Sequence, residues 1–336
     1  EAEAIRLLYE SFLRRLNETS AQEGIQQSDS RLLSAAVVPT GPTAPKKRVI
    51  LVVSTLLGMM AGIGIVALRS LRDTRFRSVE DLEAVTGSPV IGQIPVIPAR
   101  RRAGVLDYLI RKPASLAAES VRNLRTSILM SRSERPVRTI MVCSCLPGEG
   151  KTTLSVALAQ NLAAMGRKVV IIEGDIRRRF LSGYLAAHGR GLPDYMSVLS
   201  GESDLAQATI RHDKGNFDIL LSGEAQDRNP ADVLSSEGFK AMVAEARRRY
   251  DHVIIDTPPV LLVPDARILS REVDFTLLAV AWNRTTHDQV LDARNLFERI
   301  GRPIDGFVLN NVKKARLGRG GQNPYYYGPG ARYYVN

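Results

Sequence analysis

The residues with the clearest chemical potential in this sequence form a glycine-rich turn that carries a lysine and two threonines. The turn reads Cys145-Leu146-Pro147-Gly148-Glu149-Gly150-Lys151-Thr152-Thr153. It follows a short apolar run, 139–144, and opens a helical pattern that continues through Gln160 and Ala164. A strand, a glycine-rich turn and a helix in this order are the structural context of a P-loop. The pattern therefore predicts that residues 147–153 bind the phosphates of a nucleotide, ATP.

Each part of the turn has an expected role in holding a triphosphate. Backbone N–H groups around Gly148 and Gly150 would curl around the β-phosphate, and the helix N-terminus adds its partial positive charge. Lys151 is expected to reach the β- and γ-phosphates, and the Thr152 hydroxyl is expected to ligate Mg²⁺. Cys145 stands where the simple G-x-x-x-x-G-K-T pattern has its first glycine. The alternative is a glycine-rich helix start with a chance lysine, but the preceding strand and following helix favour the P-loop.

Carboxylates follow two other apolar runs. The run 253–255 ends at Asp256, and the run 169–172 ends in Glu173-Gly174-Asp175-Ile176-Arg177. Ligands of open α/β sheets bind at the carboxyl edge, so we expect these groups to converge on the phosphates. Asp256 and Asp175 are predicted to position the metal, and Arg177 to contact the nucleotide. Single carboxylates are usually solvated, but apolar runs that repeatedly end in acid are hard to explain in that way.

The elements that must position these residues alternate between short apolar runs and helical stretches from Leu116 onward. The apolar runs are TIMVCS, KVVIIEGD, FDILLS, HVIIDTPP, FTLLAVAW and DGFVLN. Apolar runs rich in β-branched residues, separated by helices, indicate a parallel sheet that is covered on both faces. We therefore predict an α/β fold, a P-loop NTPase with a mostly parallel sheet flanked by helices, over residues 116–314.

An uncharged apolar run of twenty residues, 49–68, precedes this domain. At about 1.5 Å per residue it spans roughly 30 Å, the hydrocarbon thickness of a bilayer, so it predicts a single transmembrane helix. A buried core helix is the alternative. Basic residues flank the run on both sides, so the positive-inside rule decides its orientation only weakly. Because nucleotide is cytoplasmic, we expect the C-terminal side to lie inside.

The segments around this run complete the expected organisation. Residues 1–38 begin with apolar side chains at helical spacing, which predicts the end of a helical region in a longer protein. Residues 39–48 are rich in proline and cannot continue a helix. Residues 69–115 are expected to be a basic cytoplasmic linker. Its run Arg100-Arg101-Arg102 would favour anionic membrane lipid, with a plain solvated linker as the alternative.

The motifs together resemble the bacterial tyrosine kinases of the polysaccharide co-polymerase type, the exopolysaccharide chain-length regulators. Residues 144–153, 173–177 and 256–259 look like the three Walker motifs of that family, and Asn229–Leu234 resembles its Asn-Pro segment. The resemblance implies a protein-tyrosine kinase anchored in the bacterial inner membrane. It further implies that residues 1–38 are periplasmic, that the kinase domain is cytoplasmic, and that the protein regulates polysaccharide polymerisation and export.

Two details of the resemblance concern assembly and catalysis. Glu119, Arg122 and Arg125 are similar to the E-x-x-R-x-x-R motif by which such kinases assemble into rings, and their spacing places them on one helix face. An ordinary surface charge pattern is the alternative. Glu173 stands where the family usually has aspartate. The residues therefore leave open whether Glu173 or Asp175 accepts the tyrosine proton, and which of the two touches Mg²⁺.

The end of the chain, 315–336, is predicted to be a flexible tail rich in tyrosine. Its tyrosines are Tyr325, Tyr326, Tyr327, Tyr333 and Tyr334. From Lys313 to the end the sequence contains no acidic residue, while five residues are basic. The resemblance implies that these tyrosines are phosphorylated in trans by adjacent subunits and dephosphorylated by a protein-tyrosine phosphatase. An aromatic tail that binds a partner is the alternative.

The overall charge and the remaining alternatives narrow the class of protein. A formal net charge of +11 predicts an anionic partner, but no groove-reading motif is present, so nucleic acid is not expected. The competing hypothesis is a regulatory ATPase of the partitioning or cell-division type, which switches an assembly without transfer to tyrosine. Those relatives carry an extra lysine in the P-loop, and Leu146 occupies that position here. The sequence therefore favours the kinase.

Overall fold

The computed structural model describes residues 2–23, 38, 41, 44–71, 73–99, 101–131, 136–184, 194–212, 214–223 and 229–313. The five tail tyrosines lie outside this part of the chain. The chain divides into two compact units, Glu1–Arg69 and Ser70–Asn336. Each unit is described by itself.

The first unit contains two helices, α1 (Ala2–Glu23) and most of α2 (Lys47–Leu71). Over Lys47–Arg69 the mean hydropathy of α2 reaches 2.5 and none of its most apolar window is buried. Most leucine and valine side chains along it are more than half exposed, such as Leu51 at 68% and Val66 at 68%. The helix is long and apolar enough to cross a bilayer, which confirms the predicted transmembrane helix.

The second unit is built on an eight-stranded sheet. Its strands are β1 (Val90–Pro95), β2 (Thr139–Ser144), β3 (Val169–Glu173), β4 (Thr209–His212), β5 (Phe217–Leu220), β6 (His252–Asp256), β7 (Phe275–Ala281) and β8 (Gly306–Val312). Their order in the sheet is β1-β8-β7-β2-β6-β3-β5-β4. All neighbouring strands are parallel except β4, which pairs antiparallel with β5. The predicted α/β fold is confirmed, with β1 and β4 as strands that the apolar runs did not reveal.

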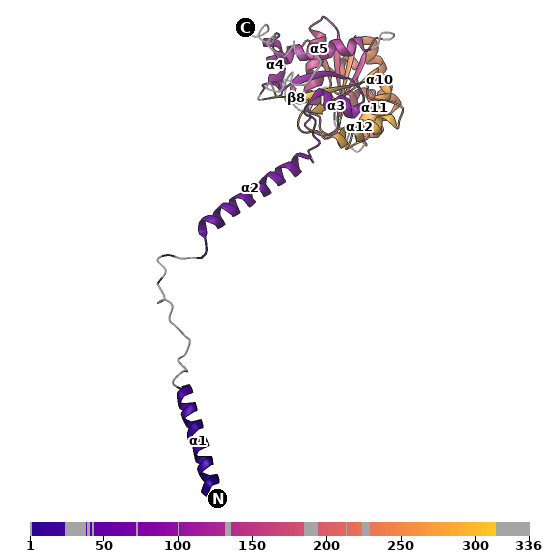
Figure 1. The fold of residues 1–336 in the computed structure, drawn as a ribbon. Coiled ribbons are helices and arrows are strands. Elements are labelled where there is room, and N and C mark those ends of the chain that lie inside the picture. The colour runs from indigo at the N-terminus through magenta and orange to yellow at the C-terminus, as the bar shows by residue number, and fades with distance from the viewer. Residues whose placement is uncertain are drawn as a thin grey trace. The chain divides into compact units, whose positions relative to one another are not determined.

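Helices cover both faces of the sheet. They are α3 (Val79–Thr86), α4 (Ala103–Arg111), α5 (Leu116–Met130), α6 (Lys151–Ala163), α7 (Tyr195–Leu199), α8 (Leu205–Ala208), α9 (Pro230–Ser235), α10 (Glu237–Arg249), α11 (Asp265–Leu269) and α12 (His287–Glu298), with short 3₁₀ helices at Leu181–Tyr184 and Ser270–Glu272. Alternate residues of one strand enter different cores. Ile254 packs with α4, α5 and α6, whereas Val253 and Ile255 pack with α9 to α12. Both faces are therefore buried, as Figure 1 shows for α5 and α12, and the central strands are apolar throughout.

The segment 69–115 is not a linker, which corrects the expected domain boundary. Its strand β1 pairs with β8 at the edge of the sheet, and α3 packs against α12. Phe76, just after α2, is fully buried. An edge strand that is short and contains glycine and proline has no clear apolar alternation, and such a strand tolerates Pro95 because one side needs no partner. The folded unit therefore begins close to the end of α2.

Candidate active site

The P-loop connects the end of β2 to the start of α6 and has the backbone shape that phosphate binding requires. Gly148 and Gly150 have φ angles of 78° and 90°, a left-handed conformation that other residues rarely adopt. A Cβ on Gly150 would lie 2.3 Å from the Asn310 amide nitrogen. These two glycines are therefore fixed both by their backbone conformation and by a close neighbour.

Two groups from outside the loop hold this turn in place. The Arg284 guanidinium donates to the carbonyl oxygens of Pro147 and Gly148, at 3.1 and 3.0 Å. The Asn310 amide donates to the carbonyl oxygen of Glu149 at 2.8 Å. Three successive carbonyls are thereby occupied by protein donors, so the loop keeps its shape without a ligand.

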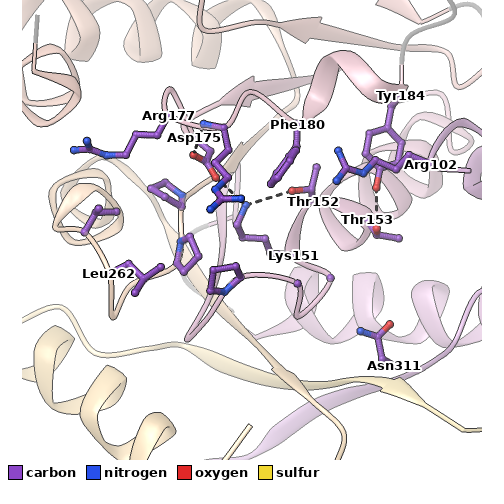
Figure 2. Close-up of a pocket in the computed structure, with 17 residues that line it drawn as sticks. Arg102, Lys151, Thr152, Thr153, Asp175, Arg177, Phe180, Tyr184, Leu262 and Asn311 are labelled. Carbon is purple, nitrogen blue, oxygen red and sulfur yellow. Dashed lines mark hydrogen bonds and ion pairs between the residues drawn. The ribbon is translucent and has the colours of Figure 1, made fainter. Parts of the chain in front are cut away.

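Four side chains predicted to hold phosphate and metal meet at the base of this loop, and Figure 2 shows three of them, Lys151, Thr152 and Asp175. The Lys151 Nζ lies 3.4 Å from Asp175 Oδ2 and 3.7 Å from Asp256 Oδ2. The Thr152 hydroxyl donates to Asp256 Oδ2 at 2.7 Å, and the Ser155 hydroxyl donates to Asp256 Oδ1 at 3.2 Å. All of these side chains are more than nine-tenths buried. Residues far apart in sequence are thus brought together at the carboxyl edge of the sheet.

Burial and charge act on Asp256 in opposite directions. Burial raises the pKa of Asp256 above its ordinary value, and the neighbouring Lys151 ammonium lowers it. The effect of burial is the larger, so the pKa of Asp256 lies above the ordinary value for aspartate. An arriving cation would therefore stabilise a carboxylate that the protein interior disfavours.

The donor set fits a magnesium ion that is shared with phosphate. Among the described residues no group of three or more His, Cys, Asp or Glu side chains could hold a metal alone. Mg²⁺ usually takes one or two carboxylates and completes its shell with substrate phosphates and water. Thr152 and Asp256 in contact, with Asp175 nearby, form such a partial set.

A cavity of about 480 Å³ opens above these groups. Of the predicted nucleotide-binding residues it is lined by Pro147, Gly148, Gly150, Lys151, Thr152, Thr153, Asp175 and Arg177. The prediction missed other lining side chains, including Arg102, Phe180, Tyr184, Leu262 and Asn311 (Figure 2). Asn311 could have been found from its position at the tip of an apolar run. Arg102 could not, because its segment was expected to be a linker.

Three of these residues, Tyr184, Arg102 and Phe180, extend the cavity wall beyond the P-loop. The Tyr184 hydroxyl hydrogen-bonds the Thr153 hydroxyl at 2.8 Å, and the Arg102 guanidinium lies 4.2 Å from the centre of the Phe180 ring. Burial raises the pKa of Tyr184. The tyrosine therefore stays neutral and serves as a fixed wall next to the loop.

Glu149 is directed into the protein and does not line the cavity. Its Oε2 accepts from the Leu146 backbone at 2.8 Å, and its Oε1 accepts from the Thr285 hydroxyl. The side chain is almost completely buried, and burial raises its pKa. Of the predicted roles of Glu149, only its backbone N–H remains available to phosphate.

Glu173 also differs from its neighbour Asp175. Its Oε1 accepts from the Leu181 backbone at 2.8 Å, and its Oε2 accepts from the backbone and hydroxyl of Ser222 at 3.2 and 3.0 Å. Glu173 does not line the cavity, whereas Asp175 does. The two carboxylates that the sequence left as alternatives therefore have different surroundings.

Arg177 is held at the cavity by a buried acid that the sequence did not single out. Its Nε lies 3.4 Å from Asp265 Oδ2, and its side chain remains 40% exposed. Asp265 is fully buried, and burial raises its pKa. In Figure 2 the Arg177 side chain points away from Lys151, so it lies at the rim of the site and not at its base.

The predicted assembly motif lies on α5, away from the lining of this cavity. Arg122 pairs with Glu119 three residues before it, and Arg125 donates to Asn161 of α6 at 2.8 Å. Burial lowers the pKa of Arg125. The three residues share a helix face, as expected, and all three already have partners within the chain.

The sheet, the loop and the acids at its edge define a P-loop NTPase domain. Two family models match the chain: a G-rich domain on putative tyrosine kinases over residues 1–71, and an AAA domain over residues 137–281. The tyrosine-protein kinase ptk of Acinetobacter johnsonii is 29% identical over 95% of this chain and 44% of its own length. The succinoglycan biosynthesis transport protein ExoP of Rhizobium meliloti is 27% identical, again over 95% and 44%.

A solved structure agrees with these relatives. The kinase domain of the Escherichia coli tyrosine kinase ETK matches with a TM-score of 0.62 and 29% identity, covering 70% of this chain and 93% of that domain. The chain is thus similar to bacterial tyrosine kinases over nearly its whole length. It spans less than half the length of the curated relatives named here.

Proposed function

We propose that this chain is part of a membrane-anchored protein-tyrosine kinase that uses Mg-ATP to phosphorylate the tyrosine cluster at its own C-terminus. The single observation that carries the proposal is the meeting of Lys151, Thr152, Asp175 and Asp256 at the base of one cavity. The name of the similar Acinetobacter johnsonii protein, a tyrosine-protein kinase, supports tyrosine as the acceptor.

The residues of this site divide the work of phosphoryl transfer. Lys151 exchanges its two carboxylate partners for the β- and γ-phosphates, which keeps its charge paired while the triphosphate enters. Thr152 and Asp256 present their oxygens to the metal, and Ser155 fixes the second Asp256 oxygen. A bound Mg²⁺ would be held by Thr152 and Asp256 and would supply positive charge that neutralises part of the phosphate charge. The fixed backbone N–H groups of the loop hold the phosphates in line with the acceptor.

Asp175 is the better candidate for the carboxylate that receives the tyrosine proton. It lines the cavity with one oxygen 3.4 Å from the Lys151 Nζ, whereas Glu173 does not line the cavity and accepts from Leu181 and Ser222 instead. In the transfer step the tyrosine oxygen bonds to the γ-phosphorus, the bond from that phosphorus to the bridging oxygen breaks, and the hydroxyl proton passes to the carboxylate while ADP leaves.

The proposed setting of this reaction follows from the rest of the chain and from its relatives. Helix α2 anchors the protein in the bacterial inner membrane with the kinase domain on the cytoplasmic side, next to anionic lipid. Adjacent copies form a ring through the α5 motif and phosphorylate Tyr325, Tyr326, Tyr327, Tyr333 and Tyr334 of one another. ExoP is named for succinoglycan biosynthesis and transport, which supports a role with polysaccharide polymerisation and export machinery. A protein-tyrosine phosphatase would remove the phosphates from these tyrosines.

The test is transfer from labelled ATP by the purified chain in detergent. We expect label on tail tyrosines, located by mass spectrometry of the C-terminal peptide, and no label in a Lys151→Met variant. A variant with all five tail tyrosines changed to phenylalanine separates the tail from other acceptors. Release of free phosphate without labelled tyrosine would instead establish a regulatory ATPase and reject the kinase.

A further inference from the structure

A second cavity of about 390 Å³ lies between α9, α10, α11 and Ile300, two residues beyond the end of α12. Its lining combines three cations, Lys240, Arg267 and Arg271, with the apolar side chains of Leu234, Ile268 and Ile300. None of these residues lines the cavity above the P-loop. Its volume lies within the range of about 300–1,000 Å³ that is common for small-molecule sites.

The charges of this cavity are only partly balanced by the protein. Glu272 is the one acidic side chain in the lining, against three basic ones. Lys240 pairs with Glu237 at 2.6 Å, but Glu237 is 89% exposed, so the pair is weak and open to exchange. The cavity therefore keeps a net positive charge.

One of the three cations, Arg267, has a nitrogen that the described residues leave without an acceptor. Its Nε atom is buried and has no hydrogen-bond partner among the residues that the structure describes. The nearby backbone carbonyls of Ser270 and Val273 already accept from Arg302. A buried donor without an acceptor is destabilising, and a small shift of the Arg267 guanidinium toward an anion in the cavity would supply the acceptor.

The apolar wall restricts which anion fits. Leu234 is 1% exposed and belongs to the main core, and Ile268 and Ile300 pack against the same core, so this wall is rigid. Arginines beside a flat apolar wall suit a phosphate carried on an aromatic ring, because the guanidinium binds the phosphate oxygens while the wall contacts the ring.

We propose that this cavity binds a phosphotyrosine side chain of the C-terminal segment 314–336. The inference rests on the proposed function, which supplies the phosphate. Without phosphate the segment is basic and carries no acidic residue, so the cations of the cavity would repel it. Each phosphate adds about −1.5 to −2 charges and reverses that repulsion. The cavity thus binds the product of the kinase reaction, and it binds this segment only when the segment is phosphorylated.

The test uses synthetic peptides of residues 321–336, labelled with a fluorophore, and the dephosphorylated full chain in detergent. One peptide carries phosphate on Tyr327, one carries none, and one has phosphoserine in place of Tyr327. We expect the phosphotyrosine peptide to bind at least tenfold more tightly than either of the others, by fluorescence anisotropy. Because the phosphate is installed chemically, this result does not depend on whether the chain proves to be a kinase.

Three variants locate the binding site. Arg271→Gln changes an exposed lining residue and should weaken the phosphotyrosine peptide at least fivefold without affecting folding. Arg267→Gln should weaken it at least tenfold. Arg178→Gln, at the nucleotide cavity, should leave the affinity unchanged. Equal affinity for the phosphorylated and plain peptides, or a loss with Arg178→Gln and none with Arg271→Gln, would overturn the proposal.

Discussion

The tips of β6 and β3 look alike in sequence and differ in structure. Each is a buried apolar strand that ends in a carboxylate, and the two strands are neighbours, with Glu173 paired in register with Asp256. Asp256 accepts from Thr152 and Ser155 of α6, directly beneath the P-loop. Glu173 accepts from Leu181 and Ser222 and faces the protein. Of these two strand-end carboxylates, only that of Asp256 lies at the base of the P-loop.

The difference teaches that the donors around a strand-end carboxylate decide its role. At β6 the donors are hydroxyls that could also serve a metal, and Lys151 lies within 3.7 Å. At β3 the donors include two backbone N–H groups, which cannot turn away, so Glu173 ties the segment after β3 to the end of β5. Asp175, two residues after Glu173, is the carboxylate of this segment that lines the cavity.

The largest expected effect is at the β6 tip. Asp256→Asn keeps an oxygen for Thr152 but removes the charge that the metal requires. Tyrosine phosphorylation should fall by roughly 100-fold or more, the order seen when one electrostatic contact to the reacting groups is removed. Rates are measured at saturating Mg-ATP, and raised Mg²⁺ should recover part of the loss. A rate within threefold of the unaltered protein would show that Asp256 does not serve the metal.

The second effect separates the two carboxylates of β3. Glu173→Ala leaves the buried backbone N–H groups of Leu181 and Ser222 without an acceptor and should lower the free energy of unfolding by about 1–3 kcal/mol. The matched variant Asp175→Asn keeps an oxygen that can accept from the Arg178 backbone and leaves Asp256 to pair with Lys151. It should therefore lower the free energy of unfolding less than Glu173→Ala does, while slowing phosphoryl transfer at least tenfold. Urea unfolding followed by Trp282 fluorescence and single-turnover labelling give both numbers. The reverse pattern would make Glu173 the catalytic group.

Much of this site could be predicted from the sequence because its parts are local. The P-loop needs glycines where φ is positive and a lysine at the helix start, and both are readable over a few residues. The convergence of Asp175 and Asp256 follows from the rule that parallel strands share a carboxyl edge. Glu173 could not be assigned in this way, because Ser222 lies 49 residues away and its approach depends on packing.

The fold could be predicted to a similar degree. The strands that the prediction missed depend on non-local packing, as the surroundings of Glu173 do. Central strands are buried on both faces and read as apolar runs, as in β2, β6 and β7. Edge strands β1 and β4 have partly exposed residues and carry no such run. β1 also pairs with β8, more than 200 residues later, so its segment looked like a linker. Non-local pairing leaves little trace in local composition.

The last prediction concerns how stability depends on pH, and it involves the carboxylates of both strand tips together with two other buried carboxylates. Burial raises the pKa of Asp256, Glu173, Glu149 and Asp265 above the ordinary values of 3.8 for aspartate and 4.5 for glutamate. Between the ordinary and the raised pKa the folded state binds more protons than the unfolded state. Stability should therefore fall as pH rises through this window, by up to about 1.4 kcal/mol per pH unit for each group, and level off above it.

The measurement is the free energy of unfolding across that window, without nucleotide and with metal chelated. Asp265→Asn removes one of the four groups and should make the slope shallower. Mg-ATP binding should have the opposite sign, because it needs ionised Asp256 and so strengthens as pH rises. A free energy of unfolding that rises with pH would mean that Lys151, 3.7 Å from Asp256, outweighs burial at the β6 tip and that the carboxylate is already ionised before the metal arrives.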